Sequence, residues 1–163
     1  MVAGSVSEKV VLGVGNVLRR DEGVGVHAVR ALARHGCAAH AELMDGGTAV
    51  FDALSGWRTI EKLVVIDALQ AGGEPGTITR VTAEEVADAT GPALSLHQCG
   101  LIDALTQLQQ AGLRLGEIVI YGVEPGDTGW GDELSPAVAA SLSRLTRQVQ
   151  EDIEFAGAEE IAR

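Results

Sequence analysis

The sequence predicts one α/β domain: a twisted, mostly parallel five-stranded sheet with helices on both faces and one antiparallel strand at an edge. A length of 163 residues suits a single domain spanning 1–163, with a core at about 10–155. Hydrophobic residues make up 46% of the chain, but aromatic residues only 3%. The interior must therefore consist of aliphatic side chains, which favours layers of helices packed on a sheet.

The first strand and helix follow from the local pattern. Residues 9–14 contain the β-branched run VVLGV, which Gly15 and Asn16 end, as expected of a buried strand. A helix is predicted to begin at Asp21, because apolar residues recur at helical spacing from there to position 35. Gly36 follows where a C-terminal cap would fall.

The remaining elements alternate in the same way. After two Gly-containing turns, the segment TITRV has the alternation of a half-exposed edge strand, possibly antiparallel in its pairing. Pro136 suits the first position of a last helix, with Ser135 as its N-cap. The other predicted elements are strands at 41–44, 61–67 and 118–123, helices at 49–56, 83–90, 98–112 and 136–155, and a loop at 91–97.

Charge and composition exclude several function classes. The formal net charge of −11 disfavours nucleic-acid binding, which basic side chains drive. Cys37 and Cys99 form no disulfide framework, which indicates a reducing compartment. The N-terminus lacks the pattern of a signal peptide, and no apolar run approaches the ~18 residues that a membrane span needs. We expect a cytoplasmic monomer without membrane or nucleic-acid partners.

Three polar residues follow apolar runs at separate places in the chain: Glu22, Asp67 and His97. Carboxyl ends of parallel strands meet at one edge of a sheet, so these side chains could converge there. Two carboxylates and one imidazole suit a borderline divalent ion such as nickel or zinc and leave coordination positions open. The residues alone predict a metal-dependent hydrolase or a metal-sensing module.

Glu22 and His97 also have purely structural explanations, whereas Asp67 follows apolar residues with no Gly or Pro beside it and is harder to explain in this way. Asp21 and Glu22 could simply complement a helix dipole, worth ~0.3–1 kcal/mol. Even so, acids here, together with Leu18 in place of a third glycine, disfavour a dinucleotide site. Asp45 precedes Gly46-Gly47 and could be a turn former. His97 could be a hydrogen-bonded structural residue.

The other nucleophiles and imidazoles are weaker candidates. Cys99 would lie in the first turn of a helix, where a free cysteine is usually an inert small hydrophobe. His27, His35 and His40 lie on or just past the first helix with no acidic partner at ligand spacing. We expect them at the surface or in caps.

The motifs resemble those of the hydrogenase maturation proteases, the endopeptidases that trim the C-terminal extension from the large subunit of nickel-iron hydrogenases. The similar segments cover residues 10 to about 150. They are GVGNVLRRDEGVGVHAV, LMDGGTAVFDAL, LVVIDAL, PGTI, SLHQCGLIDAL, IYGVEP and LSPAV.

The resemblance implies a nickel-recognition site at Glu22, Asp67 and His97, with Asp45 beside the cleft in a supporting role. It also implies that the nickel belongs to the substrate, so that only a nickel-loaded large-subunit precursor is cut, with no organic cofactor. Either the metal polarises the scissile carbonyl or activates a water, or a carboxylate such as Asp45 acts as general base.

Two matters stay open at the level of the sequence. A non-catalytic nickel-binding assembly factor or metallochaperone would use the same three ligands. The loop GDTGWGDE could shape the choice of substrate, or it could be a surface loop in which Trp130 is a packed aromatic.

Overall fold

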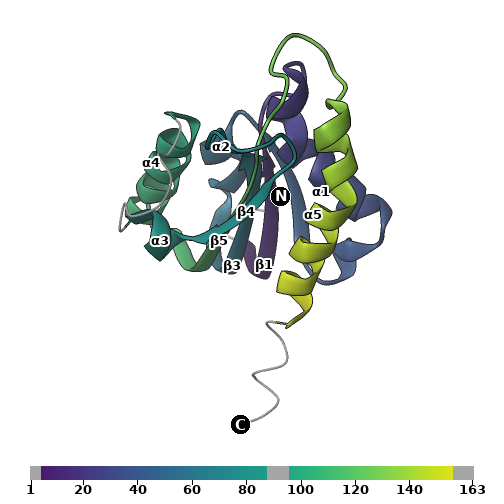
Figure 1. Ribbon diagram of the computed structural model, residues 1–163. Helices are drawn as coiled ribbons and strands as arrows, with labels where there is room; N and C mark the ends of the chain where they lie inside the picture. The colour runs from purple at the N-terminus through teal and green to yellow at the C-terminus, as the bar shows by residue number, and fades with distance from the viewer. Residues whose placement is uncertain (1–4, 88–95, 156–163) are drawn as a thin grey trace.

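A five-stranded sheet in the order β2-β1-β3-β5-β4 forms the centre of the molecule. The computed structural model describes residues 5–87 and 96–155 (Figure 1). Strands β1 (Ser5–Val14), β2 (Glu42–Gly47), β3 (Trp57–Ala68) and β5 (Arg114–Val123) are parallel, whereas β4 (Ile78–Thr82) pairs antiparallel with β5 at the edge. The predicted fold class is confirmed.

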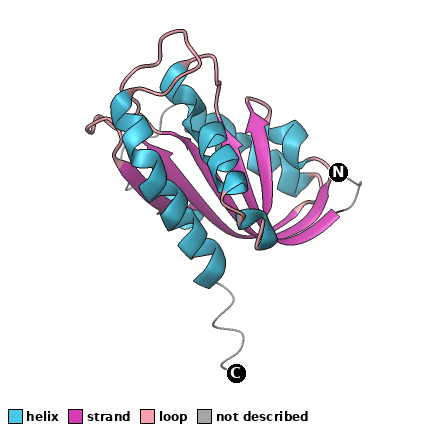
Figure 2. Ribbon diagram, turned by 90° about the vertical axis from the view of Figure 1, so that its right-hand side faces the viewer, coloured by secondary structure: helices cyan, strands magenta, loops and turns pink. Residues whose placement is uncertain are grey.

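Helices cover both faces of this sheet. Helices α1 (Val24–Arg34) and α5 (Pro136–Phe155) pack together on one face, and α2 (Val50–Leu54) and α4 (Leu96–Gln110) on the other. In Figure 2, α5, the long helix that leads to the C-terminus, lies in front of the strands. A short helix α3 (Ala83–Ala87) follows β4, and the 3-10 turns η1 (Arg20–Gly23) and η2 (Cys37–Ala39) flank α1.

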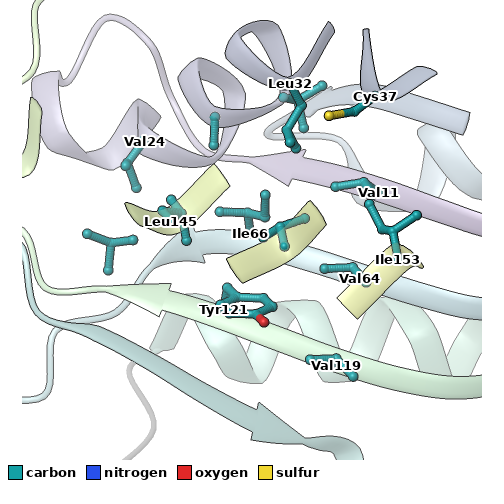
Figure 3. Packing of buried hydrophobic residues seen from close by; sticks show 14 of the residues in the cluster. Val11, Val24, Leu32, Cys37, Val64, Ile66, Val119, Tyr121, Leu145 and Ile153 are labelled. Carbon is teal, nitrogen blue, oxygen red and sulfur yellow. The ribbon is translucent and has the colours of Figure 1, made fainter. Parts of the chain in front are cut away.

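Strand β3 divides the core into two layers, because its side chains alternate between the faces. Val64 and Ile66 point to the α1/α5 layer, where they pack with Tyr121 and Leu145 (Figure 3). Leu63 and Val65 belong to the other layer, together with residues of α2 and α4. Asp67 lies two residues after Val65, near the end of β3. Its carboxylate is therefore on the same face of the sheet as Leu63 and Val65, the face that α2 and α4 cover.

Two predicted boundaries were wrong near the expected site. The segment after Asp21 does not start as an α-helix, because the 3-10 turn η1 precedes α1 at Val24. Helix α4 begins at Leu96, so the backbone of His97 lies in its first turn and not in a loop. Pro92 suggested the loop, but proline restricts only its own position, the residue before it and a helix that would run through it. The rest of that predicted loop, residues 91–95, lies outside the described residues.

A partly buried acid on α5, Asp152, connects this helix to the sheet. Asp152 accepts hydrogen bonds from the Tyr121 hydroxyl and the Arg80 guanidinium, and Lys62 lies 3.5 Å away. Burial acts to raise the pKa of Asp152, but these partners outweigh it and hold the pKa below its usual value. The cluster is a structural anchor. Across the described ranges, no helix combines the length and apolar character that spanning a membrane would need.

The junction of β1, β3 and α1 depends on the absence of a side chain at Gly25. A Cβ there would lie 2.0 Å from the carbonyl oxygen of Ile66 and 2.4 Å from that of Val14. Gly25→Ala should therefore lower the free energy of unfolding by about 3 kcal/mol, since backbone atoms cannot move aside cheaply. Urea denaturation measures this change.

Gly100 supplies the matched control for that substitution. It lies in α4, and a Cβ there would have no heavy atom of the described residues within 4 Å beyond its own helix backbone and its chain neighbours. Gly100→Ala should raise stability by about 0.5–1 kcal/mol, because alanine favours the helix. Equal losses from both variants would show that close backbone packing at Gly25 is unimportant.

Candidate functional site

A pocket of about 520 Å³ lies at the carboxyl ends of β1 and β3. The chain leaves β1 for β2 on one side and returns to β3 on the other, so this is the point where the strand order reverses and where open α/β sheets bind ligands. Residues from β1, η1, β3, α2, α4 and the β5–α5 loop line it. Among them are Val14, Gly15, Asn16, Glu22, Phe51, Asp67, Gly100, Leu101, Ala104, Pro125 and Thr128.

Asp67 is the most perturbed acid in the pocket. It is 5% exposed, and its Oδ1 accepts a hydrogen bond from the Ala68 amide at 2.8 Å. Burial raises the pKa of Asp67 to about 7; the Ala68 hydrogen bond opposes this rise, and the negative charge of Glu22 adds to it. The carboxyl group therefore titrates near neutrality, and a cation in the pocket would stabilise its charged form.

Glu22 reaches the same pocket from the 3-10 turn η1. Its side chain is about one-quarter exposed, and the guanidinium of Arg19 lies 3.9 Å from its Oε1. Gly15 has φ +130°, and a Cβ there would lie 1.7 Å from the carbonyl oxygen of Glu22. The glycine after β1 thus allows η1 to fold back against the end of the strand, which brings Glu22 near Asp67.

Asp21, the neighbour of Glu22, has a structural role that the sequence did not reveal. Its carboxylate is fully buried and accepts hydrogen bonds at 2.7–2.8 Å from the amides of Gly126, Asp127 and Ser135, and from the Ser135 hydroxyl. Burial acts to raise the pKa of Asp21, but these bonds outweigh it and lower the pKa. Asp21 therefore ties η1 to the β5–α5 loop, which supplies Pro125 and Thr128 to the pocket.

The structure separates Asp45 from the two pocket acids. Asp45 lies within β2, two residues before the strand ends at Gly47, so the predicted strand end at 44 was wrong; its side chain is exposed and does not line the pocket. Its Oδ2 lies 3.1 Å from the Arg30 guanidinium, and its Oδ1 accepts a hydrogen bond from the Gly47 amide. This arrangement is the turn-forming alternative that the glycines after Asp45 indicated.

The third expected ligand, His97, is placed only by its backbone. Its side chain and that of Cys99 lie outside the described part of the structure. Among the side chains that are described, no three of histidine, cysteine, aspartate or glutamate come close enough to hold a metal ion. The described acids fit a metal as a pair, since their mutual repulsion would be relieved by a cation.

The other histidines lie on or just after α1. His35 Nδ1 lies 2.7 Å from the Ala31 carbonyl oxygen at the helix end, which confirms the expected capping role, and His40 is exposed. His27 differs from the expectation because its Nε2 is buried without a hydrogen-bond partner among the described residues. Burial and the nearby Arg30 and Arg34 lower the pKa of His27, so it stays neutral.

Known proteins resemble this chain in sequence. A family model described as hydrogenase maturation protease matches residues 26–152. The hydrogenase 2 maturation protease of Escherichia coli K12 is 34% identical over 156 residues, which are 94% of this chain and 95% of that protein. The hydrogenase expression/formation protein HupD of Thiocapsa roseopersicina is 36% identical over 151 residues, covering 91% and 67% of the two chains.

Solved structures resemble it in fold. The hydrogenase maturating endopeptidase HybD from Escherichia coli superposes with a TM-score of 0.78 at 31% identity, over 93% of this chain and 94% of that one. The [NiFe] hydrogenase maturation protease HybD from Thermococcus kodakarensis gives a TM-score of 0.76 at 26% identity, over 91% and 100%. The parallel sheet and its antiparallel edge strand are thus shared with these proteases.

Proposed function

Because this chain belongs to the hydrogenase maturation protease family, we propose that it is an endopeptidase that removes the C-terminal extension of a nickel-iron hydrogenase large-subunit precursor after nickel insertion. The nickel is part of the substrate in this proposal. Glu22, Asp67 and His97 recognise it, and cleavage follows only when it is present.

The observation that carries the proposal is the pair of acids in one pocket. A buried carboxyl group with a pKa of about 7 beside a second carboxylate is costly to a protein that does not use it. A divalent cation brought by the substrate would offset the burial of Asp67 and the repulsion from Glu22 together. Nickel accepts oxygen and imidazole ligands, so it suits the predicted set.

Helical spacing supports His97 as the third ligand. Gly100, Leu101 and Ala104 of α4 line the pocket. Position 97 precedes them by three, four and seven residues, and such positions share one face of a helix. This spacing supports the proposal that His97 acts together with the two acids.

The geometry favours the route in which the substrate's metal activates the peptide bond. A general base must come within hydrogen-bond reach of the attacking water. Asp45 is ion-paired with Arg30 and does not line the pocket. A metal bound near Asp67 and Glu22 could polarise the scissile carbonyl or a water without a contribution from Asp45.

Incubation with the large-subunit precursor of the host's own hydrogenase tests this function. We expect mass spectrometry to detect one released C-terminal peptide and a precursor shortened by the same mass. A stable complex with an intact, nickel-loaded precursor would instead support the non-catalytic assembly factor.

The role of His97 is tested by the same assay. His97→Ala should lower the processing rate at least ~100-fold, because one ligand of the substrate's metal is lost, while the circular dichroism spectrum stays unchanged. His40→Ala is the matched control, since His40 is exposed and does not line the pocket. Normal processing by His97→Ala would remove His97 from the site.

A further inference from the structure

Large apolar side chains are exposed beside the pocket. Among the described residues, Leu18, Phe51 and Trp130 are the exposed large hydrophobic residues, and Trp130 is 75% exposed. Phe51 lines the pocket itself. Leu18 precedes η1, and Trp130 lies in the β5–α5 loop, which arches over the top of the sheet in Figure 1. The three residues therefore gather at the carboxyl edge that holds Glu22 and Asp67.

Backbone hydrogen bonds hold Trp130 in place although its ring is exposed. The Gly131 amide donates to the Leu18 carbonyl oxygen at 3.0 Å, and the Arg20 amide donates to that of Gly131 at 3.0 Å. Arg20 Nε also donates to the carbonyl oxygen of Trp130 at 3.2 Å. The loop backbone is thus paired with the segment before α1, so little backbone freedom would be lost on binding.

Arg19 connects Trp130 to the pocket. Its guanidinium carbon lies 5.3 Å from the centre of the Trp130 ring, within the range of a cation–π contact. The same side chain donates to the Thr128 carbonyl oxygen at 2.7 Å and lies 3.9 Å from Glu22 Oε1. One arginine therefore separates the exposed ring from a pocket carboxylate.

We propose that Trp130 and Leu18 form a docking surface for an apolar segment of the hydrogenase precursor that flanks the peptide to be cut. The proposal rests on the proposed function and adds a determinant of substrate choice to it. Tryptophan and arginine are among the residues that contribute most to binding at protein interfaces. Trp130 and Arg19 adjoin the pocket, because Arg19 donates a hydrogen bond to Thr128 of the pocket lining.

The size of the surface favours this occupant over a second copy of the chain. Trp130 and Leu18, even together with Phe51 of the pocket, offer a few hundred Å² at most. A standard interface needs roughly 800 Å² from each partner, and homodimers need more. The patch suffices only for a partner that also enters the pocket, as the precursor does in the proposed function.

Fluorine NMR can detect docking without any cleavage. The chain has two tryptophans, and Trp57 is buried while Trp130 is exposed. In protein labelled with 5-fluorotryptophan, adding unlabelled precursor should shift or broaden the Trp130 resonance and leave the Trp57 resonance in place. The variant Trp130→Phe assigns the signals. A complex with an unshifted Trp130 signal would overturn the proposal.

Processing kinetics give the second test. Trp130→Ala should raise KM for the precursor about tenfold with a smaller effect on kcat, because the ring contacts the substrate away from the reacting bond. Arg58→Ala, an exposed residue near the start of β3, is the control. An unchanged KM in Trp130→Ala would refute docking while the wild-type enzyme still cuts. Failure of the wild-type enzyme to cut would instead refute the proposed function.

Discussion

Asp67→Asn should make the protein more stable above pH 7 and at the same time abolish processing. Asparagine keeps an oxygen for the Ala68 amide but carries no charge in the buried position. The folded pKa of about 7 exceeds the unfolded value of 3.8, so wild-type stability should decline as pH rises from about 4 to about 7. The gain in the variant should be on the order of 2–4 kcal/mol at pH 8 and vanish below about pH 4.

Thermal unfolding at a series of pH values measures this effect. Asp45→Asn is the matched control, because Asp45 is an exposed carboxylate near the end of β2. Processing by Asp67→Asn should fall at least ~100-fold, since the pocket loses a proposed charged ligand of the substrate's metal. Parallel pH profiles for the wild type and Asp67→Asn would mean that the carboxyl group is not strained by burial.

Asp21→Asn should destabilise the fold by about 3–5 kcal/mol. The side chain accepts four hydrogen bonds in a buried position, and an amide would direct its own N–H groups at those donors. The pKa of Asp21 is lowered in the folded state, so its contribution is present above the unfolded pKa and is lost as pH falls through the folded value. Urea denaturation at pH 7 and at acid pH should therefore show the variant and the wild type converging in acid.

Glu22→Gln provides the contrast to that variant. Glu22 is partly exposed and faces the pocket, so the substitution should change stability by less than about 1 kcal/mol. Processing should nevertheless be lost, because Glu22 is a proposed contact of the substrate's nickel. Two adjacent acids would then have separate tasks. Comparable destabilisation by both variants would contradict this division.

The sequence predicted the fold and the pocket acids for a shared reason. Apolar runs mark the strands, and the topology of parallel strands brings their ends together, so Asp67 and Glu22 could be expected at one edge before any contact was known. The predicted helix 136–155 agrees with α5, because Pro136 marks its start.

Contacts between distant segments could not be predicted in this way. The partners of Asp21 lie 105 to 114 residues further along the chain, and no local pattern reveals a buried carboxylate that accepts hydrogen bonds from a remote loop. The alternative of a packed aromatic at Trp130 was wrong, because the ring is exposed and lies over Arg19. The β5–α5 loop pairs with the segment before α1 through backbone hydrogen bonds. Because almost every residue carries the same backbone groups, the sequence carries no signal for such a pairing.

The central claim is that the protein acts on nickel already held by its substrate. The direct measurement is the rate of C-terminal peptide release, followed by mass spectrometry, from nickel-loaded and nickel-free samples of the same precursor. We expect release from the loaded sample alone, and restoration of release when nickel is inserted into the other sample. Equal rates from the two samples would contradict the account.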